Sequence, residues 1–171
     1  RSVKELLALA RAKPGALTSA SAGIGSSNHL ALVLFTMMSG ADINHIPYKG
    51  AAPAVTDVIG GHSHMTFAPI AAVVSPIKSG RMRALASTAA TRSALFPELP
   101  TIAEAGVPGY DASGWNALLA PRATPREIVL RVNAALVDSL NAPRVKEILA
   151  TSGAEAVGNS PEEFSRFLQS E

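Results

Sequence analysis

The fold of this chain is decided by one stretch, which reads Thr18-Ser19-Ala20-Ser21-Ala22-Gly23-Ile24-Gly25-Ser26-Ser27-Asn28-His29. It opens with a short strand predicted over 17–21 and leads into an apolar run over 30–38 that predicts a long helix. A strand, a glycine-rich turn and a helix in this order are typical of α/β proteins. We therefore start from residues 21–29, the Gly/Ser loop, and work outward.

The Gly/Ser loop has the composition of an anion-binding turn. Gly23 and Gly25 lack a Cβ atom, so the backbone can turn sharply there and a ligand can come close. The following helix begins with unpaired N–H groups at the positive end of its dipole. The loop also supplies hydroxyl groups, on Ser21, Ser26 and Ser27. A carboxylate or phosphate site is one hypothesis, and an ordinary helix cap, where serine and glycine are also common, is the other.

Two well-known phosphate-binding motifs do not fit this loop. The dinucleotide fingerprint needs a third glycine where Asn28 stands, and the Gly-Lys-Ser/Thr of a phosphate-binding loop is absent. The motif alone therefore does not decide between the two hypotheses.

The same order of elements recurs after the Gly/Ser loop. Further strands are predicted over 42–47, 63–68 and 82–88, with helices over 51–59 and 71–79. The resulting βαβαβαβ order predicts an α/β fold with a parallel sheet and right-handed crossovers. Ligands of such sheets bind outside the carboxyl ends of the strands, where the turns 21–29, 48–53 and 68–71 fall.

The chain changes character beyond residue 88. A Pro-rich connection, 89–109, holds one short predicted helix that begins at the capping box Thr101–Glu104. Capping residues predict helices over 125–140 and 143–152, and a last helix that begins at Ser160. We place the internal boundary within 110–120 and expect Trp115 to belong to the core of a hinge.

The composition of the chain limits which classes of function are expected. The chain has 171 residues, is 47% hydrophobic and 16% charged, and carries a formal net charge of +2, so a packed domain is expected and a nucleic-acid partner is not. It has no cysteine, which excludes disulfides and zinc–thiolate sites. No apolar run reaches about 18 residues, so we expect no membrane insertion. The chain starts at Arg1 without a signal peptide, and we interpret it as a mature or truncated piece of a longer protein.

Several segments together resemble the solute-binding proteins of tripartite tricarboxylate transporters, the Bug family. Residues 21–31, with Ser-Ala-Gly-Ile-Gly-Ser-Ser-Asn-His-Leu-Ala, are similar to its Ser-x-Gly-x-Gly-Ser-x-x-His-Leu-Ala segment. Residues 46–50, with Ile-Pro-Tyr-Lys-Gly, are similar to its Val-Pro-Tyr-Lys-Gly segment. Residues 78–86, 97–106 and 153–155 also follow its patterns, in the same order.

The resemblance implies a two-lobed periplasmic binding protein of type II. Family members capture a small carboxylate between the lobes and deliver it to a membrane permease. By this analogy residues 1–113 form the second, ligand-binding lobe, and residues 114–171 form the hinge and the helix-rich return segment that completes the first lobe. The N-terminal half-domain would be missing, and exchange or pairing with another copy would cover the incomplete lobe.

The resemblance also implies how a ligand is held. The family grips a carboxylate with backbone N–H groups, hydroxyls and waters, without a dedicated arginine. The ligand-binding residues expected here come from the three turns: Ser21, Ala22, Gly23, Gly25, Ser26, Ser27, Tyr48, Lys49, Gly50 and Ala68. Two departures from the family pattern are Ser19-Ala20 in place of Tyr-Gly, and Ala68 in place of a polar or acidic residue.

Other readings of single residues remain open. Lys49 is either an electrostatic ligand partner or a solvated lysine, and Tyr48 either walls the cleft or packs against the lobe. His29 points to the ligand or helps to cap its helix, and His45 is expected to be structural. The pair His62-x-His64 has metal-ligand spacing on a strand but lacks a nearby carboxylate, so we predict no metal and no cofactor.

The alternative functions differ in class. Ser75-x-x-Lys78 matches one motif of penicillin-recognising enzymes, but their Ser-Asp-Asn and Lys-Thr-Gly motifs are absent, so we predict no catalysis. The main alternative is the ligand-sensing domain of a transcription regulator, which has the same fold. The leading hypothesis is a periplasmic binding protein for a small carboxylate.

Overall fold

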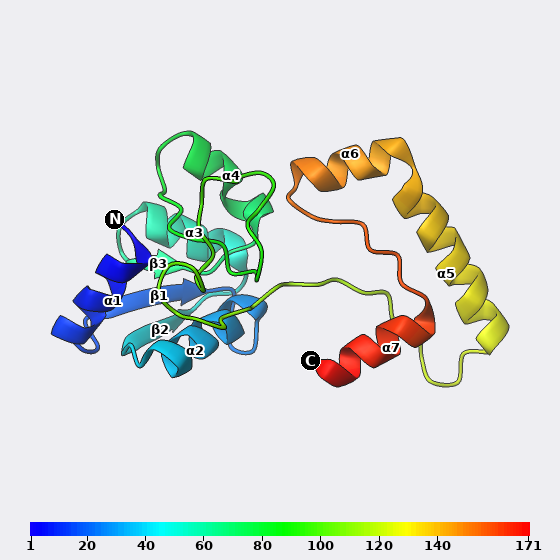
Figure 1. The fold of residues 1–171 in the computed structure, drawn as a ribbon, viewed down its shortest axis with the longest axis horizontal. Coiled ribbons are helices and arrows are strands. Elements are labelled where there is room, and N and C mark those ends of the chain that lie inside the picture. The colour runs from blue at the N-terminus through cyan, green and yellow to red at the C-terminus, as the bar shows by residue number, and fades with distance from the viewer. The chain divides into compact units, whose positions relative to one another are not determined.

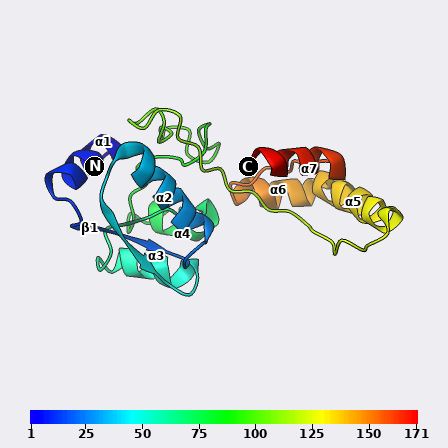
Figure 2. The ribbon, with the colours of Figure 1, turned by 90° about the horizontal axis from the view of Figure 1, so that it is seen from below.

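The computed structural model describes all residues, Arg1–Glu171, and they form two compact units, Arg1–Trp115 and Asn116–Glu171. The first unit holds the sheet and four helices, and the second unit holds three helices. Figures 1 and 2 show how the elements are arranged within each unit. The assignment of residues 1–113 and 114–171 to two lobes of a binding protein stays a prediction.

The first unit is built on a three-stranded parallel sheet. Its strands are β1 (Leu17–Ser21), β2 (Ile43–Pro47) and β3 (Met65–Thr66), and their order in the sheet is β2-β1-β3. Leu17 pairs with Ile43 and Ser21 with Pro47 along one edge of β1, while Ser19 pairs with Met65 along the other. The predicted parallel α/β fold is therefore confirmed.

Four helices of the first unit accompany the sheet. They are α1 (Val3–Ala12), α2 (Ser27–Ser39), α3 (Ala51–Ile59) and α4 (Ile70–Lys78). Because the chain passes from β1 to β2 on one side and then back across to β3, α2 and α3 lie on opposite faces of the sheet (Figures 1 and 2). Serine side chains cap two of these helices: Ser2 accepts the Glu5 N–H at the start of α1, and Ser26 accepts the His29 N–H at the start of α2.

An aromatic cluster lies at the centre of the first unit. Phe35 of α2 contacts Phe67 at 5.6 Å between ring centroids and Tyr110 edge-on at 6.1 Å. The Tyr110 hydroxyl donates a 2.9 Å hydrogen bond to the Ala31 carbonyl, and burial raises the pKa of Tyr110. This bond joins the end of the Pro-rich connection to the helix that follows the Gly/Ser loop.

The sequence prediction of a fourth strand over 82–88 is wrong. Leu85 and Ala86 pack against the core, which explains the apolar pattern, but the segment forms only an isolated bridge between Ser87 and Thr101. The edge strand β3 (Met65–Thr66) is only two residues long, so it offers little edge for a further strand to pair with. The capping box Thr101–Glu104 likewise forms its hydrogen bonds but begins a turn instead of a helix.

The buried face of α2 also differs from the sequence prediction. The spacing of the apolar run predicts a core face that includes Met37 and Met38, yet these two side chains are 76% and 41% exposed. The helix instead buries Ala31, Leu32 and Phe35. Apolar residues occupy nearly the whole circumference of this helix, so their spacing does not select one face.

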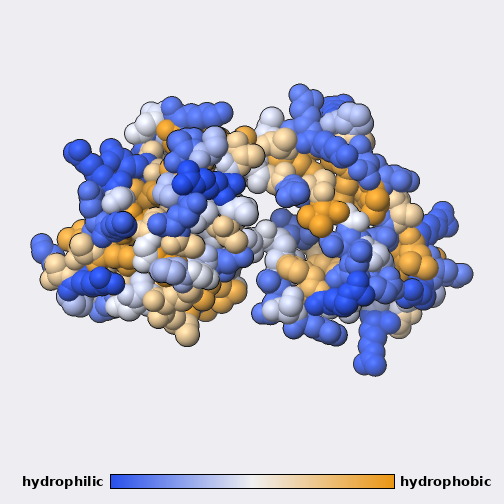
Figure 3. All heavy atoms as spheres, viewed as in Figure 1, coloured by the Kyte–Doolittle hydropathy of each residue, from blue (hydrophilic) through white to orange (hydrophobic).

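The second unit contains three helices, α5 (Arg126–Asn141), α6 (Pro143–Thr151) and α7 (Pro161–Ser170). Helix α5 contacts both α6 and α7, and Arg126 forms an ion pair with Glu162 at 2.6 Å. No residue of the three helices is buried, and hydrophobic atoms lie exposed among them in Figure 3. Trp115, which was expected in a hinge core, is 45% exposed.

Candidate functional site

The candidate site lies at the carboxyl edge of the sheet, where β1, β2 and β3 end at Ser21, Pro47 and Thr66. In the strand order β2-β1-β3, the connection after β1 runs to one side, toward β2, and the connection after β2 runs back across β1 to β3, so the chain reverses its direction across the sheet here. Open α/β sheets bind their ligands at such switch points. The three turns expected to hold the ligand therefore meet at the position that the topology favours.

Hydrogen bonds join these three turns. The Tyr48 N–H donates to the Ser21 carbonyl at 2.9 Å, and the Gly50 N–H donates to the Ala22 carbonyl at 3.0 Å. On the other side of β1, the buried Asn28 amide donates to the Phe67 carbonyl, next to Ala68. The Gly/Ser loop is thus held between its two neighbours.

The conformation of the Gly/Ser loop depends on glycine at two positions. Gly23 has a φ of 130°, and a Cβ atom there would lie 3.2 Å from the Tyr48 carbonyl oxygen. Gly25 has a φ of 77°, but the space around it is open. Gly23 therefore permits the close packing of two turns, whereas Gly25 permits a left-handed residue on the open side of the loop.

Internal hydrogen bonds occupy several groups that the sequence offered to a ligand. The Gly23 N–H donates to Ser21 Oγ at 3.1 Å, and the Gly25 N–H donates to His29 Nδ1 at 3.1 Å. The Ser26 hydroxyl donates to the Gly23 carbonyl at 2.7 Å. The Gly23 and Gly25 N–H groups therefore already have acceptors within the loop, and their part in binding a ligand stays a prediction.

The first turn of α2 keeps two N–H groups without an acceptor inside the helix. Ser26 is the N-cap, its hydroxyl accepts the His29 N–H, and its carbonyl accepts the first intrahelical bond from Leu30. The Ser27 and Asn28 N–H groups precede that bond and lie at the positive end of the dipole. Ser27 is exposed, so this helix end can receive an anion from solvent.

The turn after β2 places its polar residues differently. The half-buried carboxylate of Asp57 accepts a hydrogen bond from Ser63 and one from Tyr48, and these bonds lower the pKa of Asp57. The Tyr48 side chain thus packs onto the lobe, while Lys49 is exposed and has no ion pair. Lys49 is the cation of this turn that remains available to a ligand.

The two histidines with metal-ligand spacing take different partners. His64 Nδ1 lies 2.8 Å from Thr18 Oγ1 and accepts the Thr18 N–H at 3.1 Å. His62 Nδ1 lies 3.7 Å from Asp57. No group of three or more potential metal ligands occurs in the structure.

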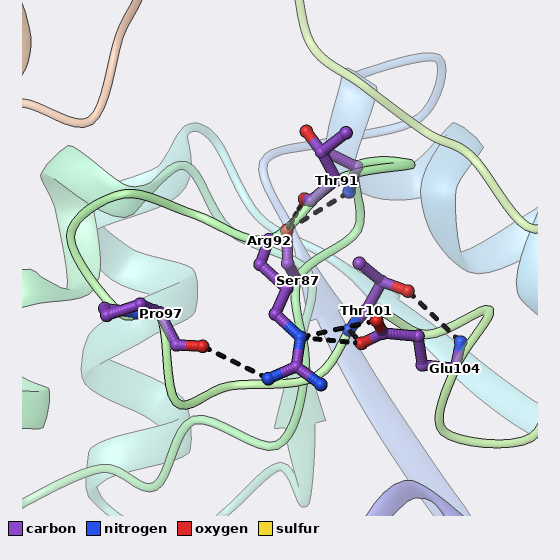
Figure 4. Close-up of polar contacts among 7 residues, drawn as sticks. Ser87, Thr91, Arg92, Pro97, Thr101 and Glu104 are labelled. Carbon is purple, nitrogen blue, oxygen red and sulfur yellow. Dashed lines mark hydrogen bonds and ion pairs between the residues drawn. The ribbon is translucent and has the colours of Figure 1, made fainter.

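A separate open hollow of about 530 Å³ lies away from the sheet edge, between the end of α4 and residues 96–99. Its lining residues include Arg81, Arg83 and Phe96. The Pro-rich wall is held by Arg92, which bonds to Glu104 at 2.9 Å and to the Pro97 carbonyl at 3.2 Å (Figure 4). None of the residues expected to bind the ligand lies in this hollow.

The sequence did not indicate two contacts of the candidate site. One is the amide of Asn28, whose role depends on the distance between α2 and the turn after β3. The other joins His45 to Ser21 and His29. The alternation of β2 places His45 on one sheet face, but only the register with β1 brings it to Ser21.

The sequence of the whole chain matches one protein family. The model of the "Tripartite tricarboxylate transporter family receptor", TctC, matches residues 1–171. BugT of Bordetella pertussis is 39% identical over 170 residues, covering 99% of this chain and 52% of BugT. A UPF0065 protein from the tcbD–tcbE intergenic region of a Pseudomonas species is 39% identical over 172 residues, covering 100% of this chain and 51% of that protein. The chain thus spans about half the length of these two relatives.

Solved structures share the fold. The structure described as "R. palustris Rpa4515 with adipate" superposes with a TM-score of 0.91 at 38% identity, covering 99% of this chain and 56% of that chain. MatC from Rhodopseudomonas palustris with bound malate gives a TM-score of 0.86 at 27% identity, covering 99% of this chain and 59% of that chain. The periplasmic binding protein BugD gives 0.87 at 29% identity, covering 99% of this chain and 57% of that chain. No helix of the present structure is both long enough and apolar enough to cross a membrane.

Proposed function

This chain belongs to the tripartite tricarboxylate transporter receptor family, the solute-binding proteins of the Bug type, and from this premise we propose that it captures a small carboxylate outside the cytoplasm. The proposed location is the periplasm, and the proposed recipient of the ligand is the membrane permease of the transporter. The chain would bind and release its ligand without catalysis. None of the relatives named above is described as a transcription regulator.

One observation carries the proposal: the exposed start of α2 lies at the switch point of the sheet, in a chain whose structural relatives include an adipate complex and a malate complex. A carboxylate oxygen can accept the free N–H groups of Ser27 and Asn28. The Lys49 ammonium from the next turn adds a positive charge near the same edge. Two-ended dicarboxylates are therefore the ligand class that we propose.

The proposed ligand-binding residues are those of the three turns. They are Ser21, Ala22, Gly23, Gly25, Ser26, Ser27, Tyr48, Lys49, Gly50 and Ala68. Within this set, Ser21 and Gly23 shape the loop through their mutual hydrogen bonds, whereas Ser27 and Lys49 face solvent. We propose that the first group positions the second.

We also propose a separate role for each of the two units. Residues 1–113 would form the ligand-binding lobe, and residues 114–171 would form the hinge and complete the other lobe. The exposed apolar side chains of α5 to α7 would then pack against the remaining part of that lobe or against another copy of the chain.

A single substitution tests the proposed anion site. Ser27→Pro removes one N–H at the first position of α2, where proline fits a helix, as Pro143 and Pro161 do in α6 and α7. Ser26 has extended backbone angles, φ −67° and ψ 158°, which a following proline tolerates.

We expect calorimetry with adipate and malate to show a roughly tenfold to hundredfold loss of affinity for Ser27→Pro, the range of one hydrogen bond to a charged acceptor. The dimethyl esters of both acids, which lack the charge, should not bind the wild-type chain. Equal affinity of the variant and the wild type would place the carboxylate elsewhere. Release of alcohol from the esters would argue for a hydrolase instead.

A further inference from the structure

Two histidine rings from different elements stack beside the Gly/Ser loop. His29 belongs to the first turn of α2, and His45 lies in the middle of β2. Their ring centroids are 4.1 Å apart and the ring planes differ by 23°. A helix and a strand that are separated in sequence are thus joined where the loop between β1 and α2 turns.

His45 holds the first residue of the loop. Its Nε2 lies 2.6 Å from Ser21 Oγ, which also accepts the Gly23 N–H at 3.1 Å and lies 3.2 Å from the Gly23 carbonyl oxygen. One arrangement uses every group: His45 Nε2–H and the Gly23 N–H donate to Ser21 Oγ, and the Ser21 hydroxyl donates to the Gly23 carbonyl. Ser21 is 1% exposed, so this bonding fixes a buried hydroxyl.

His29 holds the other side of the loop. Its Nδ1 accepts the Gly25 N–H at 3.1 Å, which requires that Nδ1 carries no proton. Gly25 has a left-handed backbone and open space where a Cβ atom would lie, so this hydrogen bond is a contact that restrains it. The stacked rings therefore restrain both Ser21 and Gly25.

The surroundings of His45 disfavour its charged form. Burial and the neighbouring His29 lower the pKa of His45, and no carboxylate forms an ion pair with either ring. The groups that face His45 are the Ser21 hydroxyl from β1 and the His29 ring from α2. A neutral pair preserves both the acceptor at His29 Nδ1 and the stacking contact.

We propose that His29 and His45 are positioning residues of the carboxylate site. They fix the Gly/Ser loop so that the Ser27 and Asn28 N–H groups stand at a set position, without either ring contacting the ligand. This inference rests on the proposed function, because it names the residues that order the same site. Because folding already orders the loop, ligand binding does not have to supply the free energy for ordering it.

Paired substitutions separate positioning from bulk packing. His29→Phe keeps a stacking ring but removes the acceptor, whereas His29→Asn keeps an oxygen near the place of Nδ1. His45→Phe keeps the ring but removes the donor to Ser21, whereas His45→Gln keeps an N–H near the place of Nε2. The ligands are adipate and malate, and calorimetry measures their affinity. Hydrogen exchange of the Gly25 amide and the midpoint of thermal unfolding are measured on the same variants.

For each phenylalanine variant we expect about a tenfold loss of affinity, the value of one lost hydrogen bond and its ordering effect. Exchange of the Gly25 amide should rise at least about tenfold in His29→Phe. His29→Asn and His45→Gln should recover most of both losses. A fall in thermal midpoint with unchanged affinity and unchanged Gly25 exchange would show a purely structural role and overturn the proposal.

The readouts also separate this proposal from the proposed function. If the wild-type chain binds neither dicarboxylate, the proposed function fails, and the exchange of Gly25 still decides whether the pair orders the loop. If the wild type binds and the phenylalanine variants bind equally well, the proposed function stands and the positioning role is wrong.

Discussion

The two units of this chain differ in how their helices are stabilised. Every buried hydrophobic side chain lies between Val3 and Tyr110, whereas α5, α6 and α7 bury none. The first unit is held by tertiary packing around Phe35, and the second by caps, an ion pair and contacts along α5. Local signals are thus sufficient to define helices. The helices of the first unit bury their apolar faces in its core, whereas the exposed apolar faces of the second unit still require a partner.

The largest expected difference between the units concerns leucine truncation. Leu32 of α2 is 2% exposed and Leu130 of α5 is 42% exposed. Leu32→Ala should lower the free energy of unfolding of the first unit by about 2–5 kcal/mol, because it leaves a cavity. Leu130→Ala should change stability by about 0.5 kcal/mol or less. Urea unfolding of both variants tests this, and equal losses would mean that the second unit has a core of its own.

The next effect concerns left-handed glycines. Gly25 (φ 77°) and Gly40 (φ 67°) both have open space around them, but only Gly25 lies in the Gly/Ser loop. Replacement of either by valine should destabilise the first unit by about 1–3 kcal/mol through backbone strain. Only Gly25→Val should also abolish binding of adipate and malate in calorimetry. Loss of binding in Gly40→Val would show that general destabilisation, and not the loop, causes the effect.

Helix caps allow a matched comparison of the units. Ser26 caps α2, and Ser160 caps α7 within a complete capping box. Each alanine variant should lose about 1 kcal/mol. Because α2 is held by the core, Ser26→Ala should retain its helix, whereas Ser160→Ala should unfold α7 locally. Hydrogen exchange along both helices measures this, and equal protection of α7 in the variant and wild type would contradict it.

The smallest expected effect is a dependence of stability on acid pH. Hydrogen bonds from Ser63 and Tyr48 lower the pKa of Asp57 in the first unit, and those from Ser160 lower the pKa of Glu163 in the second. A lowered pKa adds stability above the unfolded pKa of about 4, and this stability is lost as the pH falls through the folded pKa.

Asp57→Asn should therefore flatten the acid dependence of unfolding of the first unit below about pH 4. Glu163→Gln should make only the helix content of α7 less dependent on acid pH. Thermal scans between about pH 3 and pH 7 followed by circular dichroism test both variants. An unchanged acid slope in Asp57→Asn would mean that the carboxylate is not stabilised by these bonds.

The sequence predicted what local chemistry determines. Serine caps and alternating strands are short-range signals, and the structure confirms the predicted helices α2, α3 and α4 and the parallel sheet. The helices of the second unit were predicted for the same reason, because Pro143 and the capping box at Ser160 mark their first residues. Local signals, however, do not show whether a helix is buried.

The errors lie where tertiary contacts decide the outcome. The segment 82–88 alternates like a strand but packs Leu85 on the core without a ladder, and α2 is apolar on too many sides for its spacing to select a face. The sequence also does not show that Ser21 Oγ and His29 Nδ1 accept hydrogen bonds from the Gly23 and Gly25 amides. The resemblance to a known family located the turns, and only the packed structure showed which groups in them remain open.

The most direct test of the central claim is a titration of the ¹⁵N-labelled chain with malate and adipate, followed by amide chemical shifts. This method detects the weak binding that we expect from a chain spanning about half the length of its relatives. The account predicts that shifts concentrate in residues 21–29, 48–50 and 67–68, with the largest at the Ser27 and Asn28 amides. Shifts centred on Arg81 and Arg83, or no shifts at saturating dicarboxylate, would contradict it.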